Sequence, residues 1–484
     1  MRPYHASVPA FSGLRFLCGL LGIWSSLSLL PAQTITPEPL PEPRIPGFRF
    51  PESEATLTRW IMEMSRGTTA DVVDAATARI HQHGWGLWTA LTANSSQFSA
   101  GQRLRVFETW LTADELTSNP AVRNIAWRPS PRRRARLTPL NELRRPAEAA
   151  ASIPPATAES QIDRVMGFTK YDPTAADHIA RQDLLKLSTL DTLLQAGAQQ
   201  IPPFPASALV VKPVFQIATS RALVDDRYFL LKTWSGPPGV PQPWGPSQWP
   251  AGVWIDTWGE GRGDGDVDPD PAADGSTRTE ETTYALGNFI HYQLSAADAQ
   301  LLNQAKPGTG ASAGDYAILV AMHVAGRETA RWTWQTFWWT PTPDDPREPS
   351  SAAIASRRPP RLRGAPRHYA MAMAYTLLSP DQPYVGGENI GTAVYAYNPY
   401  IEARFAAADL PDSRPGFDST GKPAANNVGV QTNCMSCHMQ ATYNPRQLPT
   451  APRFAGSRYV DLGAAEFTGT LQVDFLWSLP RHAK

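Results

Sequence analysis

The 484-residue sequence predicts an α+β fold that is mainly β, with a helical N-terminal region, an antiparallel sandwich-like centre and a loop-rich C-terminal segment. Two observations carry this prediction. Between residues 53 and 117 apolar side chains recur mostly at helical spacing, as in Leu57, Trp60, Ile61 and Met64. From about residue 205 the pattern changes to short aromatic or β-branched runs separated by Gly and Pro, which is typical of antiparallel sheets.

The composition excludes two classes of protein. Lys plus Arg number 44 and Asp plus Glu number 44, so the formal net charge is zero. A balanced charge argues against a basic nucleic-acid binder and against an acidic disordered chain. The 16 Trp, 14 Tyr and 17 Phe supply large side chains for a buried core.

The first 32 residues have the pattern of a secretory signal peptide. Arg2 and Arg15 precede an apolar run over 16–30, and the small residue Ala32 precedes Gln33. The run is short for a membrane span, which needs about 20 residues, although a retained anchor is the alternative. We therefore expect cleavage after Ala32, a periplasmic or secreted protein, and no membrane span in the mature chain.

The remaining chain divides by its patterns. We expect a helical N-terminal region, a linker, a second helical segment, a β-rich domain and a segment that carries the cysteine motif, over residues 33–127, 128–160, 161–204, 205–410 and 411–484 respectively. Asp172 and Pro173 are typical of a helix start, and Gly197 of a helix end.

A Cys-x-x-Cys-His motif lies near the C-terminus, at Cys434, Cys437 and His438. Two thiols at this spacing can each add to one vinyl group of a haem, and the adjacent imidazole can then bind the iron from the same side. Cys18 leaves with the signal peptide, so an exported chain keeps no long-range cysteine pair and no disulfide framework. The motif predicts one covalently bound haem c, with His438 as the proximal iron ligand.

Two other interpretations compete for the same cysteines. A Cys-x-x-Cys pair is also a thiol–disulfide redox motif, but that motif usually follows a strand in a thioredoxin-like unit, and no such unit is visible here. The pair can also form half of a zinc site, which leaves the fourth ligand unidentified.

The segment NCMSCHMQATY (433–443) resembles the haem segment of mono-haem c-type cytochromes among exported bacterial proteins. More loosely, the chain resembles a group of large bacterial proteins with one such motif near the C-terminus. The looser resemblance rests on HGWGLW (83–88), FETWL (107–111), TWQTFWW (333–339) and YNPYIEARF (397–405).

The order of the motifs departs from that of small cytochromes of this kind. In those, the attachment motif comes early and a Met ligand follows it. Here no Met follows Met439, and His482 is the last His. The resemblance therefore leaves the sixth iron ligand to residues upstream, to His482, or to an open or water-bound site.

Several upstream side chains are candidates for the sixth ligand. We favour Met371, Met373 and His368, with His323, Met322 and His291 as further candidates. A Met on an apolar strand face is more often core filling, and the alternation in HYAMAMAY (368–375) fits that role for Met371 and Met373. The identity of the axial ligand is one of the main determinants of haem chemistry.

Three further clusters have a structural and a functional interpretation. Arginines at 357, 358, 361, 363 and 367 fit a solvated loop, haem propionate partners or a docking site for an acidic redox partner. Alternating acids from Asp264 to Asp270 fit an acidic surface loop or a calcium site. The tryptophans at 332, 334, 338 and 339 fit a core, an electron relay or a sugar platform.

The sequence thus predicts an exported mono-haem c-type cytochrome that transfers single electrons to a redox partner protein or to a small-molecule donor or acceptor, without nucleic acid. A haem enzyme that acts on peroxide, O₂ or a small organic substrate at an open distal site is the first alternative. A β-rich binding module with a redox-sensing haem is the second. The sequence does not decide whether the protein is an enzyme, and a haem-dependent oxidoreductase is the activity that the motif would allow.

Overall fold

The computed structural model describes residues 35–99, 101–118, 165–263, 278–305, 308–376, 394–406, 428–446, 463 and 465–484, and the backbone of short strands at 138–139, 378–381, 390–393, 416–417 and 423–424. The expected signal peptide, the loop Asp264–Asp270 and all of the linker 128–160 except 138–139 lie outside these residues. In the described part the fold is α+β with predominantly antiparallel sheets, as the sequence predicts.

The helices are α1 (Glu54–Arg66), α2 (Ala70–Leu91), α3 (Ala113–Ser118), α6 (Pro173–Arg181), α7 (Leu187–Gln195), α8 (Ala296–Ala305), α9 (Ala352–Ala355), α10 (Cys434–Met439) and α11 (Ser478–His482). No helix in this part of the chain is long and apolar enough to cross a membrane. The longer strands are β1 (Asn94–Ser99), β2 (Gln102–Arg105), β7 (Leu209–Ala218), β8 (Tyr228–Lys232), β9 (Gly252–Asp256), β12 (Tyr316–Gly326), β13 (Thr333–Trp339) and β14 (Tyr369–Ala374).

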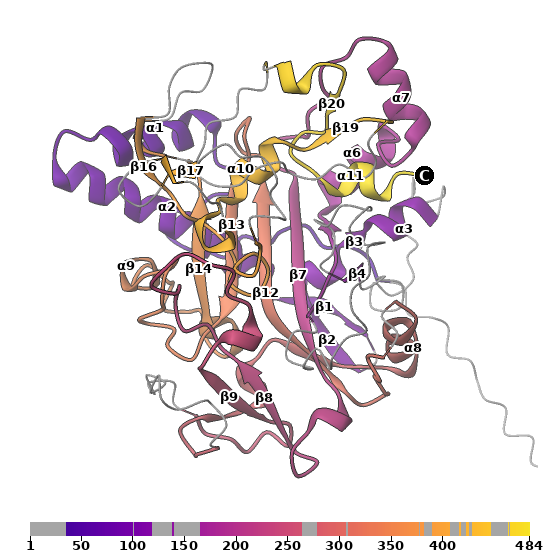
Figure 1. The fold of residues 1–484 in the computed structure, drawn as a ribbon, viewed down its shortest axis with the longest axis vertical. Coiled ribbons are helices and arrows are strands. Elements are labelled where there is room, and N and C mark those ends of the chain that lie inside the picture. The colour runs from indigo at the N-terminus through magenta and orange to yellow at the C-terminus, as the bar shows by residue number, and fades with distance from the viewer. Residues whose placement is uncertain are drawn as a thin grey trace, which may run out of the picture.

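The shorter strands are β3 (Leu111–Thr112), β4 (Thr138–Pro139), β5 (Val165–Gly167), β6 (Lys170–Tyr171), β10 (Thr283–Ala285), β11 (His291–Gln293), β15 (Leu378–Asp381), β16 (Ile390–Ala393), β17 (Gly416–Phe417), β18 (Pro423–Ala424), β19 (Thr442–Tyr443) and β20 (Leu471–Gln472). Nine of the described strands form one antiparallel sheet, whose main path runs β14-β13-β12-β7-β5-β4 (Figure 1). A smaller sheet joins β8, β9 and β10, of which β9 and β10 are parallel.

Helix α2 covers one face of the large sheet. Trp88 of α2 stacks on Phe337 of β13, with ring centroids 4.4 Å apart. Gly84 lies where a Cβ atom would meet the sulfur atoms of Met371 and Met373 at 2.7 and 3.0 Å. The alternation predicted for β14 is therefore present, and its two methionines point toward α2.

The opposite face of the sheet is covered by the C-terminal segments. Trp334 and Phe337 are three residues apart in β13, so their side chains point to opposite faces. Trp334 belongs to a buried cluster with Met435 and Met439 of α10 and with apolar side chains of residues 471–479. In Figure 1, α10 lies in front of β13, with α11 farther toward the C-terminal end of the chain.

A buried polar network joins α2 to the sheet. His83 shares a hydrogen bond with the Tyr375 hydroxyl through Nδ1 (2.6 Å) and pairs with the Glu328 carboxylate through Nε2 (3.0 Å). Thr333 donates to the other Glu328 oxygen, and Gln335 donates to Tyr375. The side chains of His83 and Glu328 are 2% and 0% exposed, so hydrogen bonds within this network replace the water that burial removes.

The region predicted as mostly helical also contains a hairpin. Strands β1 and β2 pair around Gly101, which adopts a φ of 78°. This left-handed conformation is easy for glycine and closes the tight turn. Farther on, Asp172 caps α6 by accepting from the amides of Thr174 and Ala175, as the sequence predicts.

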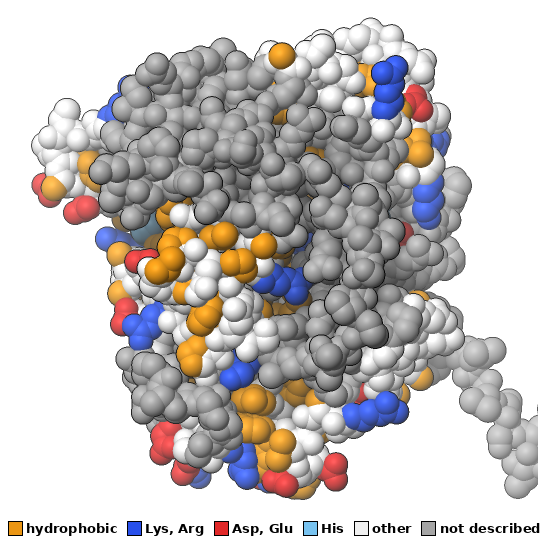
Figure 2. Space-filling view, in the orientation of Figure 1, with side chains coloured by type: hydrophobic (Ala, Val, Ile, Leu, Met, Phe, Trp, Pro, Cys, Tyr) orange, Lys and Arg blue, Asp and Glu red, His pale blue; other side chains and the backbone are white. Residues whose placement is uncertain are grey.

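The small sheet and the surface around it carry mixed charge. Arg227 makes two hydrogen bonds to the carboxylate of Asp256 in β9, at 2.8 and 2.6 Å. In Figure 2, acidic and basic side chains are interspersed along the lower part of the molecule, where β8 and β9 lie in Figure 1. This mixed pattern agrees with the zero net charge of the sequence.

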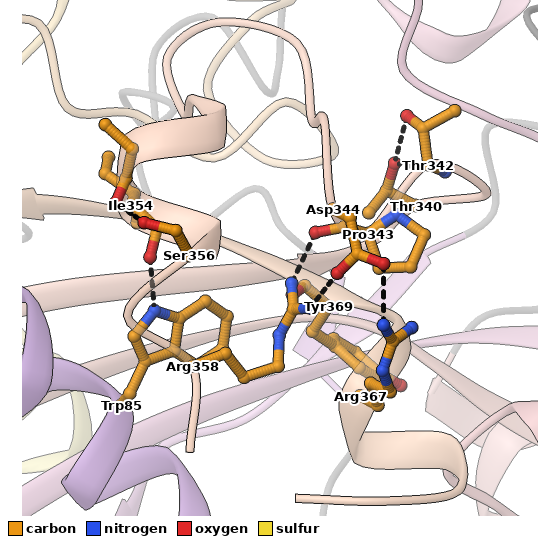
Figure 3. A network of polar contacts seen from close by, with 11 residues as sticks. Trp85, Thr340, Thr342, Pro343, Asp344, Ile354, Ser356, Arg358, Arg367 and Tyr369 are labelled. Carbon is orange, nitrogen blue, oxygen red and sulfur yellow. Dashed lines mark hydrogen bonds and ion pairs between the residues drawn. The ribbon is translucent and has the colours of Figure 1, made fainter. Parts of the chain in front are cut away.

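Part of the arginine cluster is bound within a local network. Arg358 and Arg367 both pair with Asp344, and the Arg358 guanidinium lies 4.8 Å from the ring centroid of Trp85 (Figure 3). Arg361 donates to the carbonyl of Pro43. These contacts give the three arginines a structural role on the α2 side of the molecule.

Candidate haem-attachment site

The Cys-x-x-Cys-His motif forms the short helix α10, and Asn433 fixes where that helix begins. The Oδ1 atom of Asn433 accepts from the amide of Met435 at 3.0 Å, which is a helix N-cap. Its Nδ2 group donates to the carbonyls of Thr376 and Val394. One side chain therefore starts the helix and ties it to the chain that follows β14.

Both cysteines of α10 are half-buried thiols that form no disulfide. Helical spacing places Cys434, Cys437 and His438 on neighbouring positions of one helix face. Burial, and next the negative charge of Glu402, raises the pKa of Cys437 to about 12 and that of Cys434 well above its ordinary value. A raised pKa is the opposite of the lowered cysteine pKa that is typical of a thiol–disulfide redox motif.

The imidazole of His438 is oriented by two contacts. Its Nδ1 donates to the backbone carbonyl of Phe475 at 2.7 Å, which places the lone pair of the neutral ring on Nε2. Its ring packs on the indole of Trp334, with centroids 4.1 Å apart and planes at 35°. A metal-binding imidazole is commonly oriented by such a hydrogen bond from its second nitrogen.

An unusual turn presents the Phe475 carbonyl. Asp474 and Phe475 have φ values of 43° and 68°, in the left-handed region that residues other than glycine rarely adopt. The Asp474 carboxylate holds the turn, because it accepts from Arg327 Nε (3.1 Å) and from the amide of Phe204 (2.9 Å). The indole of Trp332 donates to it as well.

His438 lines a cleft between the large sheet and the C-terminal segments. The cleft holds about 730 Å³ of space, part of it open to solvent. Its lining is mainly apolar, with two imidazoles and a few charged groups among the apolar side chains: Thr169, Val210, Val211, Lys212, His323, Ala325, Trp334, Ile401, Glu402, Phe405, His438, Leu476, Trp477, Ser478 and Arg481. A largely apolar lining with a few polar groups is typical of sites for cofactors and small ligands.

A second imidazole, His323 of β12, lies in the same cleft and pairs with Glu402. Its Nε2 is 2.8 Å from the Glu402 carboxylate. Sequence reasoning named His323 among the further candidates but missed Glu402. The signal was present in YNPYIEARF (397–405), where Glu402 is the single acid in an aromatic run.

The three favoured sixth-ligand candidates do not line this cleft. Met371 and Met373 point toward α2, on the opposite face of the sheet. His368 precedes β14, and its ring stacks on Trp339. The structure therefore leaves these residues apart from Cys434, Cys437 and His438.

The remaining candidates also lie elsewhere. Met322 is buried in the largest core cluster, His291 hydrogen-bonds to the carbonyl of Phe289, and His482 ends α11. None of the three is part of the cleft lining.

The tryptophans of the 332–339 cluster are buried, as expected for a core, and Trp334 is also the side chain that packs on His438. The large aromatic side chains that are clearly exposed in the described residues are Phe98 of β1 and Trp258 in the turn after β9, and they do not form a row. This arrangement offers no support for a sugar platform.

No family model matches the chain, and neither the curated proteins nor the solved structures contain a match. Within the described ranges, no group of three or more His, Cys, Asp or Glu side chains is arranged to hold a bare metal ion. A fourth ligand for the zinc interpretation is thus not identified there.

The donor set and the surroundings of α10 fit a haem. Two thiols and an imidazole share one helix face, and of these three donors His438 is the one that lines the cleft. The adjoining cleft is lined by apolar side chains such as Val210, Leu476 and Trp477, which suit a porphyrin face. Lys212 and Arg481 also line it and have the charge that would suit propionates.

Proposed function

We propose that this protein is an exported mono-haem c-type cytochrome that transfers single electrons to a redox partner. The observation that carries the proposal is the hydrogen bond from His438 Nδ1 to the Phe475 carbonyl. It orients the imidazole of the attachment motif at the wall of an apolar cleft, as an iron ligand requires. Cys434 and Cys437 are the residues that would hold the haem covalently.

In this function the haem, when bound, supplies a reversible one-electron couple. The protein residues have three tasks. The thiols fix the position of the group, the Phe475 carbonyl increases the electron density on His438, and the apolar lining limits access of water. Limited access of water is one of the factors that set a haem reduction potential.

The His323–Glu402 pair at the cleft also favours a second candidate function. An imidazole and a carboxylate in hydrogen-bond contact form an acid–base pair. Facing an open iron site, such a pair suits a haem enzyme that acts on peroxide, O₂ or a small organic substrate. The two functions differ in whether the sixth position of the iron is filled by a side chain or is open.

The first experiment expresses the full-length chain in a bacterium that has working cytochrome c maturation machinery. We expect a haem-stained band on a denaturing gel, one haem in the intact mass, an N-terminus at Gln33, and a reduced-minus-oxidised spectrum of a c-type haem. The double variant Cys434→Ala, Cys437→Ala should lose the stain. Cys18→Ser is the matched control and should keep it, because Cys18 precedes the expected cleavage site.

The outcomes separate the proposals. A colourless wild-type protein at bare polypeptide mass would overturn the haem function. A haem protein whose reduced form binds CO readily would favour the enzyme, since the sixth position is then open. A precursor that keeps residues 1–32 while still binding haem would overturn the predicted cleavage and leave the haem function standing.

A further inference from the structure

The strand register places His323 on the cleft face of the large sheet, close to the proximal imidazole. His323 of β12 pairs with Thr336 of β13, and Ala325 pairs with Trp334. Directly paired residues of antiparallel strands share a face, so His323 and Trp334 point to the same side. The two pairs are two residues apart, or about 7 Å along the strand. Because His438 packs on Trp334, both imidazoles border one space.

Glu402 links this imidazole to the attachment motif. Its carboxylate accepts from the amide of Asn398 through Oε2 (2.6 Å) and contacts His323 through Oε1 (2.8 Å). A Cβ atom on Gly429, five residues before α10, would lie 1.7 Å from the Glu402 carbonyl oxygen. The Glu402 backbone is therefore packed against the chain that leads into the attachment motif.

The backbone around Glu402 is fixed to the sheet. The Asn398 side-chain amide donates to the hydroxyl of Thr336 and to the carbonyl of Phe337, both at 2.8 Å. Thr336 is the residue that pairs with His323. The carboxylate and the imidazole that it contacts are thus held to the same pair of strands.

We propose that His323 is the second axial ligand of the haem iron and that Glu402 is the residue that positions it. This inference rests on the proposed haem function and makes its site six-coordinate. When the Nε2–H group of His323 donates to the Glu402 carboxylate, the ring nitrogen with the lone pair is Nδ1, and this nitrogen can bind a metal. A carboxylate on the second ring nitrogen fixes the tautomer and makes the ligand more basic.

Lys212 is the competing ligand in the cleft. It pairs directly with His323 across β7 and β12, so its side chain leaves the sheet on the same face. His323 is favoured because its imidazole is already oriented by the contact with Glu402, as metal-binding imidazoles commonly are. Variants of both residues decide the matter.

The test compares the haem-loaded wild type with His323→Ala. The wild type should show a six-coordinate low-spin iron in its absorption and electron paramagnetic resonance spectra, and its reduced form should resist CO. His323→Ala should become high-spin and bind CO at least tenfold more tightly. Added imidazole should return the variant to the low-spin spectrum, because it replaces the missing ligand.

Two other variants keep the inference falsifiable if His323→Ala folds poorly. Glu402→Gln should remain low-spin but show a higher reduction potential, because it removes a negative charge and leaves a less basic imidazole. His323→Met should also stay low-spin at a higher potential, with a thioether in place of the imidazole. His291→Ala is the matched control, because His291 lies outside the cleft, and its spectrum should equal that of the wild type.

Each result supports or overturns the inference. Haem-loaded His323→Ala with the wild-type spectrum would overturn it, and the same change of spectrum in Lys212→Gln instead would assign the position to Lys212. A high-spin, CO-binding wild type would also overturn it, while leaving haem attachment intact. Loss of haem from the wild type would overturn the proposed function and, with it, this assignment.

Discussion

Gly429 lies against the backbone of Glu402 so closely that a Cβ atom on Gly429 would be 1.7 Å from the Glu402 carbonyl oxygen. No side chain fits at that distance, so the chain that leads into α10 approaches the 398–405 segment only with glycine at this position. The amide of Gly429 also donates to the carbonyl of Phe405. This contact joins the segment that carries the cysteines to the segment that carries the carboxylate.

We therefore expect Gly429→Ala to lower the free energy of unfolding by about 1–3 kcal/mol, as other overpacking substitutions do. The shift of Glu402 should also disturb the spectrum of the haem-loaded protein. Chemical denaturation measures the first effect and absorption spectroscopy the second. Gly239→Ala is the control, since no atom lies within 4 Å of its Cβ position, and it should change stability by less than about 0.5 kcal/mol. Equal effects of the two substitutions would contradict the close contact.

Asp474 supports the turn that presents the Phe475 carbonyl to His438, and its loss should affect stability and the iron site together. Asp474→Ala leaves the guanidinium of Arg327, 15% exposed, without its carboxylate partner. Removal of one member of a buried pair costs about 3–5 kcal/mol, and the partial exposure here places the expected cost near the lower value. The left-handed turn should relax and the potential of the haem should rise, because His438 loses part of its hydrogen bond.

The measurements for Asp474→Ala are denaturant unfolding and a redox titration. Asp177→Ala is a suitable control, since it removes an exposed pair with Arg181 at 2.9 Å and should cost about 0.5 kcal/mol or less. If Asp474→Ala lowered stability but left the reduction potential of the haem unchanged, the turn would have no role in orienting His438.

The sequence was sufficient where the relevant signal is local. The alternation in HYAMAMAY (368–375) predicts that Met371 and Met373 lie opposite Ala370, Ala372 and Ala374 on β14. The cap at Asp172 is likewise a local signal. These features came out as the sequence predicts.

The rest of the site depends on long-range pairing, which a single sequence does not encode in readable form. His323 meets Glu402 across 79 residues, and only the register of β12 with β13 decides which face His323 occupies. A one-residue shift of that register would turn His323 toward α2. The hydrogen-bond partner of His438 is the backbone carbonyl of Phe475. Every residue has such a carbonyl, so the sequence could not indicate which one His438 contacts.

The buried His83–Glu328 pair should be among the most sensitive sites for stability in the described structure. His83→Ala leaves a fully buried carboxylate without its imidazole partner and removes a hydrogen bond from Tyr375. We expect a loss of about 3–5 kcal/mol in the free energy of unfolding. Calorimetry or denaturant unfolding measures this loss. Arg79→Ala, which breaks the exposed pair with Glu63, should cost less than about 1 kcal/mol.

We expect His368 to contribute to the loss of stability of the folded protein at acidic pH. Burial, and next the charges of Arg367 and Arg358, lowers the pKa of His368 from 6.5 to about 4. Its Nδ1 is buried and has no hydrogen-bond partner among the described residues, and its ring stacks on Trp339. The folded protein therefore keeps this imidazole neutral at pH values where the unfolded chain protonates it.

The sign of the effect follows from proton binding. Between pH 6.5 and about 4 the unfolded state binds more protons at His368 than the folded state, so the free energy of unfolding falls as the pH falls. A shift of this size corresponds to about 3 kcal/mol in the free energy of unfolding, which is present above pH 6.5 and lost by about pH 4.

The variant His368→Phe keeps an aromatic ring on Trp339 but removes the titrating group. Denaturant unfolding at a series of pH values should show a shallower fall for the variant across this window, with the remaining slope supplied in part by His81, whose pKa burial also lowers to about 4. Equal slopes for wild type and variant would show that His368 titrates in the folded state as it does in the unfolded chain.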